Sequence, residues 1–206
     1  MILVFDTETT GLPAMNLPLH HPVQPHLVQL AMLLAEDDGT ERACINVMIR
    51  PDGWEIPERA ASVHGITTEI ATRSGVSEAM ALAMWDRLAQ RADVLVAHNI
   101  GFDSFILAVA QERTKARRPV EGAPVPALFC TLHAATPLVR LPPTPKMVAA
   151  GMGNVFKSPK LSECVHHFFG EDLVGAHDAL VDVRACARLY FHLKSLVPAD
   201  AAAQAA

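Results

Sequence analysis

Strand-like and helix-like segments follow one another along this chain in an order that constrains the fold more than any other feature. A strand is expected over residues 1–7, and residues 26–51 read as a hairpin because two apolar runs flank the turn signal Asp37-Asp38-Gly39. After the hairpin, helical and strand-like segments alternate. This order predicts an α/β fold in which helices cover a mixed sheet.

The later elements are assigned from apolar spacing and from capping residues. After a short helix beginning at Pro57, we expect helices over 76–91, 103–111, 158–170 and 178–196, and strands over 93–99 and 127–131. Ser158 followed by Pro159 favours a helix start, and Gly170 favours a helix end. Residues 141–158 contain Pro and Gly and read as a mobile or substrate-facing loop.

The 206 residues are enough to bury one core and do not demand two domains. We therefore expect a single domain over 1–197 and a disordered tail over 198–206. The four scattered cysteines form no C-x-x-C pair and read as the reduced thiols of a cytoplasmic protein. Neither a signal peptide nor a stretch long enough to span a membrane is evident, so no membrane association is expected.

The formal net charge of −5 argues against a protein that coats nucleic acid with a broad basic surface. It is compatible with an enzyme that contacts only a short part of a nucleic acid, and in which divalent cations supply positive charge beside a phosphate. The basic residues that could touch phosphates are Arg113, Lys115, Arg117 and Arg118 in one segment, and Lys146, Lys157 and Lys160 in another. For the first segment, a solvated loop is the favoured interpretation.

Three acidic segments, far apart in the sequence, lie at expected strand ends or helix margins. The apolar run ILVF leads into Asp6 and Glu8, whose side chains point to the same side if the strand continues. Asp103 follows the strand over 93–99, and the last helix has His177 before it and Asp182 within it. Catalytic groups often converge at such positions. Clustered carboxylates repel one another, so we infer that these side chains are brought together to hold divalent cations.

These segments carry a family resemblance. DTETTG (6–11), HNIGFD (98–103) and HDALVD (177–182) resemble, in this order, the three motifs of the DnaQ-like 3′–5′ exonucleases of the DEDDh type. SVHGIT, which contains His64, resembles a further segment of that family. The resemblance covers nearly the whole chain, and it implies an RNase H-like fold with a central five-stranded mixed sheet flanked by helices.

The resemblance also implies a mechanism. Asp6, Glu8, Asp103 and Asp182 would hold two Mg²⁺ or Mn²⁺ ions, which suit carboxylate oxygens and can assist a phosphodiester displacement together. His177 would be the general base, since an unperturbed imidazole titrates at about 6.5. The product would be a nucleoside 5′-monophosphate, released from a 3′ end.

Further residues are assigned smaller roles. By the resemblance, Thr9, Thr10 and Leu12 would contact the 3′-terminal nucleotide, and His64, Asn99 and Phe102 are candidates for the substrate pocket. Phe102 could equally pack in the core. His98 is expected to orient the second motif rather than bind metal, and Asp178 to cap the last helix.

The substrate and partners are less tightly defined. Thr9 follows Glu8 as in proofreading-type members, whereas relatives that trim short RNA tend to have Met there, so the 3′ end of single-stranded DNA is favoured over RNA. A replication polymerase is a conceivable partner, but no motif supports it.

Three alternatives remain open. One is a catalytically silent nucleic-acid-binding module, and another is an aspartyl phosphatase, which would leave the second and third motifs unexplained. The third is zinc binding by Cys164, His166 and His167, but only 164 and 167 share a helix face and no second ligand pair is evident.

Overall fold

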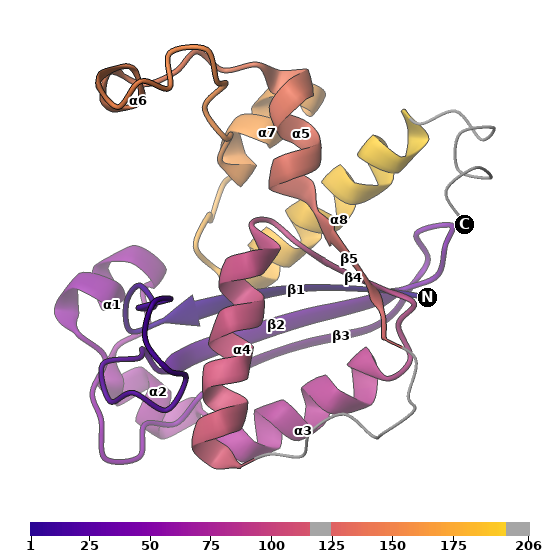
Figure 1. Cartoon of the computed structure of the whole chain (residues 1–206). Helices are drawn as coiled ribbons and strands as arrows, with labels where there is room; N and C mark the ends of the chain where they lie inside the picture. The colour runs from indigo at the N-terminus through magenta and orange to yellow at the C-terminus, as the bar shows by residue number, and fades with distance from the viewer. Residues whose placement is uncertain (116–124, 197–206) are drawn as a thin grey trace.

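The computed structural model describes residues 1–115 and 125–196, and a five-stranded sheet forms the centre of this part of the chain. The strands are β1 (Ile2–Thr9), β2 (Leu27–Ala35), β3 (Glu41–Met48), β4 (Val94–Ala97) and β5 (Ala127–Cys130). Their order is β3-β2-β1-β4-β5 (Figure 1). β1 pairs with β2 antiparallel and with β4 parallel, which confirms the mixed sheet expected from the sequence.

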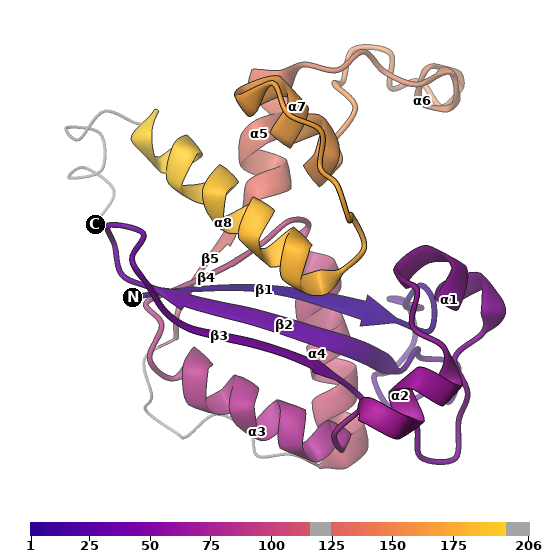
Figure 2. The ribbon, with the colours of Figure 1, turned by 180° about the vertical axis from the view of Figure 1, so that it is seen from behind.

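Helices cover both faces of the sheet. They are α1 (Glu58–His64), α2 (Thr68–Ser74), α3 (Glu78–Ala89), α4 (Ile100–Thr114), α5 (Thr131–Val139), α6 (Pro145–Ala149), α7 (Leu161–Phe169) and α8 (Ala179–Ser195). α3 and α4 pack on one face and α8 on the other, with α5 and α7 against α8 (Figures 1 and 2). No helix in the described ranges is long and apolar enough to cross a lipid bilayer.

Strand β1 contributes to two hydrophobic cores because its side chains alternate between the two faces of the sheet. Leu3 and Phe5 are buried in the core with α3 and α4, whereas Ile2 and Val4 are buried in the core with α8. The same alternation continues past the apolar run. The side chains at positions 6 and 8 therefore point toward the face that α8 covers, and that at position 7 points away from it.

Several local expectations are confirmed, and others are wrong. The hairpin turn has Gly39 at φ 88°, where a glycine avoids steric strain. The sequence reading missed α2 and α5 and took α6 as part of a loop. α7 begins at Leu161 and not at Ser158, because the carboxylate of Glu163 accepts the N–H of Lys160 and caps the helix there.

Arg113 was expected in a solvated loop, and this is wrong. It lies in the last turn of α4, where it pairs with Glu78 at 3.3 Å and donates to the carbonyls of Gln24 and Pro25. It thereby anchors the Pro-rich segment that follows β1. Arg117 and Arg118 lie outside the described residues, as does the tail over 198–206.

Candidate active site

The three acidic segments meet at one edge of the sheet. β1 and β4 run parallel, so the ends from which the first and second motifs emerge lie side by side. A cleft of about 1060 Å³ opens there. The candidate catalytic residues lining it are Asp6, Glu8, Asp103, His177 and Asp182, and the candidate substrate residues lining it are Thr9, Thr10, Leu12, His64, Asn99 and Phe102.

The second motif is held to the first by a pair of hydrogen bonds. Asp103 is 3% exposed in the first turn of α4, and its Oδ1 accepts the Thr7 N–H at 3.0 Å and the Thr7 hydroxyl at 2.7 Å. Thr7 can reach it because its side chain points to the face opposite Asp6 and Glu8. Thr7, which lies between Asp6 and Glu8, thus fixes the position of Asp103.

His98 and Asn99 shape the turn between β4 and α4. The two ring nitrogens of His98 contact the Thr131 hydroxyl and the Pro159 carbonyl, each at 3.0 Å. This agrees with an orienting role, since both nitrogens are occupied. Asn99 adopts the left-handed conformation at φ 76°, directly before the helix that carries Asp103.

The third motif is organised by its own backbone. Asp178 caps α8 by accepting the Leu180 N–H at 2.9 Å, as expected. His177 has a left-handed backbone at φ 69°, and its N–H donates to Asp182 Oδ2 at 2.9 Å. A non-glycine residue in this conformation is strained and tends to occur at functional sites. The hydrogen bond to Asp182 stabilises the strained turn here.

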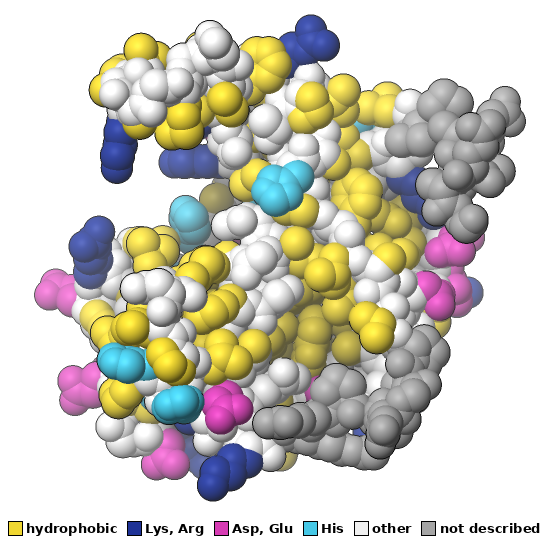
Figure 3. Space-filling view, viewed as in Figure 1, with side chains coloured by type: hydrophobic (Ala, Val, Ile, Leu, Met, Phe, Trp, Pro, Cys, Tyr) yellow, Lys and Arg dark blue, Asp and Glu magenta, His cyan; other side chains and the backbone are white. Residues whose placement is uncertain are grey.

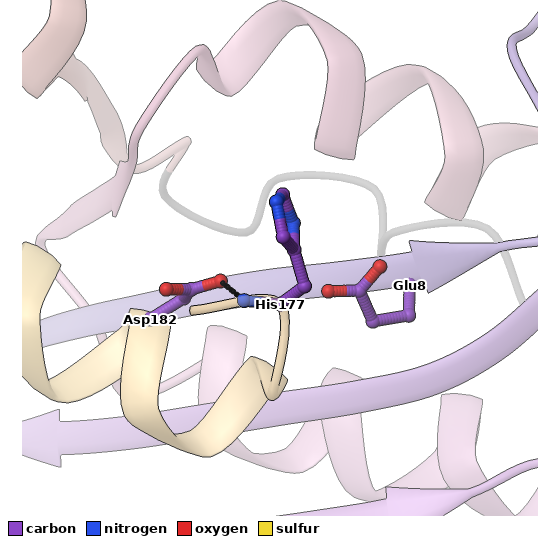
Figure 4. Close-up of side chains that lie close together, drawn as sticks. All are labelled: Glu8, His177 and Asp182. Atoms are coloured by element: carbon purple, nitrogen blue, oxygen red, sulfur yellow. Dashed lines mark hydrogen bonds between the residues drawn. The ribbon is translucent and has the colours of Figure 1, made fainter. Parts of the chain in front are cut away.

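Glu8, His177 and Asp182 form the tightest group in the cleft. One ligand atom from each lies within 4.8 Å of the others, and no other group of three such residues this close occurs in the described ranges. In Figure 4 the two carboxylates lie on either side of His177. Asp6 and Asp103 line the same cleft but stand outside this tight group.

Burial, and after it mutual repulsion, disfavours ionisation of the four carboxyl groups. Burial raises the pKa of Asp6 well above its usual range, and the charges of the neighbouring carboxylates add to the rise. Burial, followed by the same repulsion, raises the pKa of Glu8 to about 8. Burial also raises the pKa of Asp103 to about 7, although the Thr7 hydrogen bonds oppose it, and raises that of Asp182.

This donor set fits hard divalent cations. None of the four carboxylates forms an ion pair with a Lys or Arg within residues 1–115 and 125–196. Their repulsion is therefore not neutralised by a lysine or arginine in these ranges. Carboxylate oxygens are the ligands that Mg²⁺ and Mn²⁺ prefer, and Asp6, Glu8, Asp103 and Asp182 are the residues that could hold such ions.

Comparison with known proteins identifies the family. A sequence model of the family RNase_T, described as Exonuclease, matches residues 3–190. The chain belongs to the DnaQ-like exonuclease family. This confirms the family and the enzyme class that the three motifs indicated, whereas the roles of individual residues remain predictions.

Solved structures with the same fold as this exonuclease include exonuclease I from two bacteria. E. coli exonuclease I in complex with a dA16 oligonucleotide is 20% identical, with a TM-score of 0.73, and the match covers 96% of this chain and 41% of that one. A moderately thermophilic exonuclease I from Methylocaldum szegediense is 18% identical, with a TM-score of 0.71 and 96% and 41% covered. The exonuclease spans about two fifths of the length of these proteins. No curated protein sequence matches significantly.

The candidate substrate residues of the exonuclease differ in their hydrogen bonding, exposure and packing. Thr10 exchanges two hydrogen bonds with the backbone of His26, at 3.0 and 2.9 Å. Leu12 is 86% exposed at the rim of the cleft. Phe102 both lines the cleft and packs against the core, so its two interpretations are compatible. Nε2 of His64 is buried and without a hydrogen-bond partner among the described residues.

The sequence reading missed two groups of residues in the exonuclease site. α1 presents Arg59, Ala60 and Val63 to the cleft together with His64, and helical spacing backward from His64 could have found Ala60. Gln29 was also missed. It lies opposite Glu8 on β2, and its Oε1 accepts the Ala179 N–H at 3.4 Å, so it positions the start of α8.

The raised pKa values predict how the stability of the metal-free exonuclease depends on pH. A carboxyl group with a raised pKa in the folded state binds its proton more tightly there than in the unfolded chain. The free energy of unfolding should therefore fall as the pH rises from the unfolded value of Glu8, 4.5, to its folded value of about 8. One pKa unit is worth about 1.4 kcal/mol, so each unit of the rise should lower the Tm by about 3–6 °C.

Calorimetric melting in EDTA across this pH range, repeated with Mn²⁺, measures the effect. Because cations favour the ionised carboxylates, Mn²⁺ should remove most of the decrease. A metal-free Tm that rises steadily over the same range would contradict the prediction.

Proposed function

We propose that this exonuclease removes nucleotides one at a time from the 3′ end of single-stranded or frayed DNA and releases nucleoside 5′-monophosphates. The observation that carries the proposal is the meeting of all three motifs in one cleft. The choice of DNA is supported by Thr9 after Glu8, and by the structures of E. coli exonuclease I with dT13 and dA16 oligonucleotides.

Asp6, Glu8, Asp103 and Asp182 would hold two Mg²⁺ or Mn²⁺ ions. When bound, such ions supply the positive charge that stabilises the attacking and leaving oxygens of the phosphodiester. Glu8 and Asp182 contribute ligand atoms from two elements, β1 and the first turn of α8. Asp103, fixed by Thr7, completes the acidic set from α4.

His177 would take the proton from the attacking water. Its ring lies beside the Glu8 and Asp182 carboxylates. The residue itself lies in a turn, outside the helices and strands. Its backbone is fixed through the N–H bonded to Asp182, while its side chain remains at the surface of the cleft. A general base placed in this way can accept a proton at Nδ1 or Nε2 and return it to solvent.

The proposed function is tested by incubating the protein with a 5′-labelled single-stranded DNA in Mg²⁺, in Mn²⁺ and in EDTA. We expect a ladder of products shortened from the 3′ end with either metal, 5′-mononucleotides as the second product, and no cleavage in EDTA. Parallel digestion of a duplex with a mismatched 3′ end and of a short RNA defines the substrate. If the DNA is not shortened with either metal, the proposed nuclease activity is refuted. If the RNA is digested faster than the DNA, RNA and not DNA is the preferred substrate.

A further inference from the structure

A long stretch of the sequence beside the cleft contains no acidic residue. Between Gly122 and Ser162 there is no Asp or Glu, although the chain has 22 acidic residues and a net charge of −5. The Lys and Arg residues of this stretch are Arg140, Lys146, Lys157 and Lys160. The stretch therefore has a formal net charge of +4 in a chain whose net charge is −5, while the cleft beside it concentrates negative charge.

Residues 141–157 of this stretch form a projecting arm. Its two ends are joined where the Lys157 N–H donates to the Leu141 carbonyl at 3.0 Å, and the Lys157 ammonium pairs with Glu163. In Figure 3 the arm stands apart from the body at the upper left, and Lys or Arg side chains reach into the gap from both sides. Compact surface loops with closed ends are frequently functional.

The arm also exposes apolar side chains. Val148, Met152, Val155 and Phe156 are between 44% and 54% exposed. Phe156 lines a second cavity of about 420 Å³ at the base of the arm, together with His133 and Asn154. Ser158 lines both this cavity and the catalytic cleft, so the two hollows adjoin.

The catalytic cleft itself has basic residues on opposing elements. Arg59 lines it from α1, and Lys160 lines it from the segment that leads from the arm into α7. The two adjoining hollows thus lead from the acidic cluster past Ser158 to Phe156, and the catalytic cleft at one end of them carries the two basic side chains. A basic groove with an exposed aromatic ring is typical of sequence-independent binding of single strands, in which phosphates meet the cations and bases stack on the ring.

We propose that the arm and the cavity at its base bind nucleotides that lie upstream of the 3′-terminal two in a single-stranded nucleic acid. A base stacks on Phe156, and phosphates lie beside Lys146 and Lys160. This inference rests on the proposed function and adds a substrate-length requirement to it. It also predicts a preference for single strands, because a paired base cannot stack on Phe156 without leaving its duplex.

The length requirement is tested with Phe156→Ala and Lys146→Gln, using Val125→Ala and Lys194→Gln as controls that remove a similar exposed group elsewhere. We compare kcat/KM for a deoxydodecamer with kcat/KM for a dinucleotide, which is too short to reach the arm. Phe156→Ala should lower the dodecamer-to-dinucleotide ratio at least about fivefold, the low end for loss of one stacked base. The controls should keep the wild-type ratio. A wild-type ratio in both arm variants would overturn the inference.

Binding of a fluorescent dodecamer in EDTA tests the arm without catalysis. The logarithm of the binding constant is measured against the logarithm of salt concentration, and Lys146→Gln should reduce the slope by about 0.7 for one lost phosphate contact. If Lys146→Gln reduces the slope but the wild type cleaves no DNA with either metal, the proposed function alone is refuted. An unchanged slope in an active enzyme would refute the arm contact alone, and absence of both binding and cleavage would refute both.

Discussion

Replacing Asp6 by Asn is expected to abolish nucleotide release while leaving the fold intact. The substitution keeps the shape of the side chain but removes one of the four carboxylates that we propose hold the cations. Loss of metal assistance costs several kcal/mol of transition-state stabilisation, so kcat should fall at least about a thousandfold. The measurement is single-turnover cleavage of 5′-labelled DNA, with Mn²⁺ uptake followed by calorimetry in parallel.

The same variant should not be less stable than the wild type without metal. Burial and the neighbouring carboxylates raise the pKa of Asp6, so removing its charge relieves repulsion in the folded state. We expect an equal or higher Tm in EDTA. Asp52→Asn, at an exposed position away from the cleft, is the matched control and should keep full activity. An Asp6→Asn protein with wild-type activity would contradict the metal assignment.

Replacing His177 by Asn is expected to lower kcat at least about a hundredfold, the low end for losing a general base. Asn tolerates the left-handed backbone found at this position, and the N–H that holds Asp182 belongs to the main chain and is retained. The carboxylates should therefore keep their places, so metal binding should be preserved.

Mn²⁺ titration by calorimetry separates a base from a metal ligand at His177. The ring lies as close to Glu8 and Asp182 as a third ligand would, so this distinction matters. Unchanged Mn²⁺ affinity with slow cleavage supports the general base. Lost affinity, with a normal rate per bound metal, would assign His177 to the metal instead.

Sequence pattern predicted the elements of the fold wherever one local signal dominated. The turn signal at Asp37-Asp38-Gly39 set the hairpin, and apolar spacing located α3 and α8. α5 was missed because it follows β5 without any intervening turn residue, and Pro137 lies within it. Arg113 was misplaced because its partners lie on α3 and on the segment after β1, far away in the sequence.

The sequence by itself determined which acids could act and which way two of them point. Asp6 and Glu8 must share a face once the apolar run before them forms a strand, because side chains alternate along any strand. Tertiary structure alone decided what meets them: Thr7 holding Asp103, the His177 N–H holding Asp182, and an acid-free arm standing beside the cleft. Alternation is a property of the local backbone, whereas these contacts depend on how β1, α4 and α8 pack together across the whole chain.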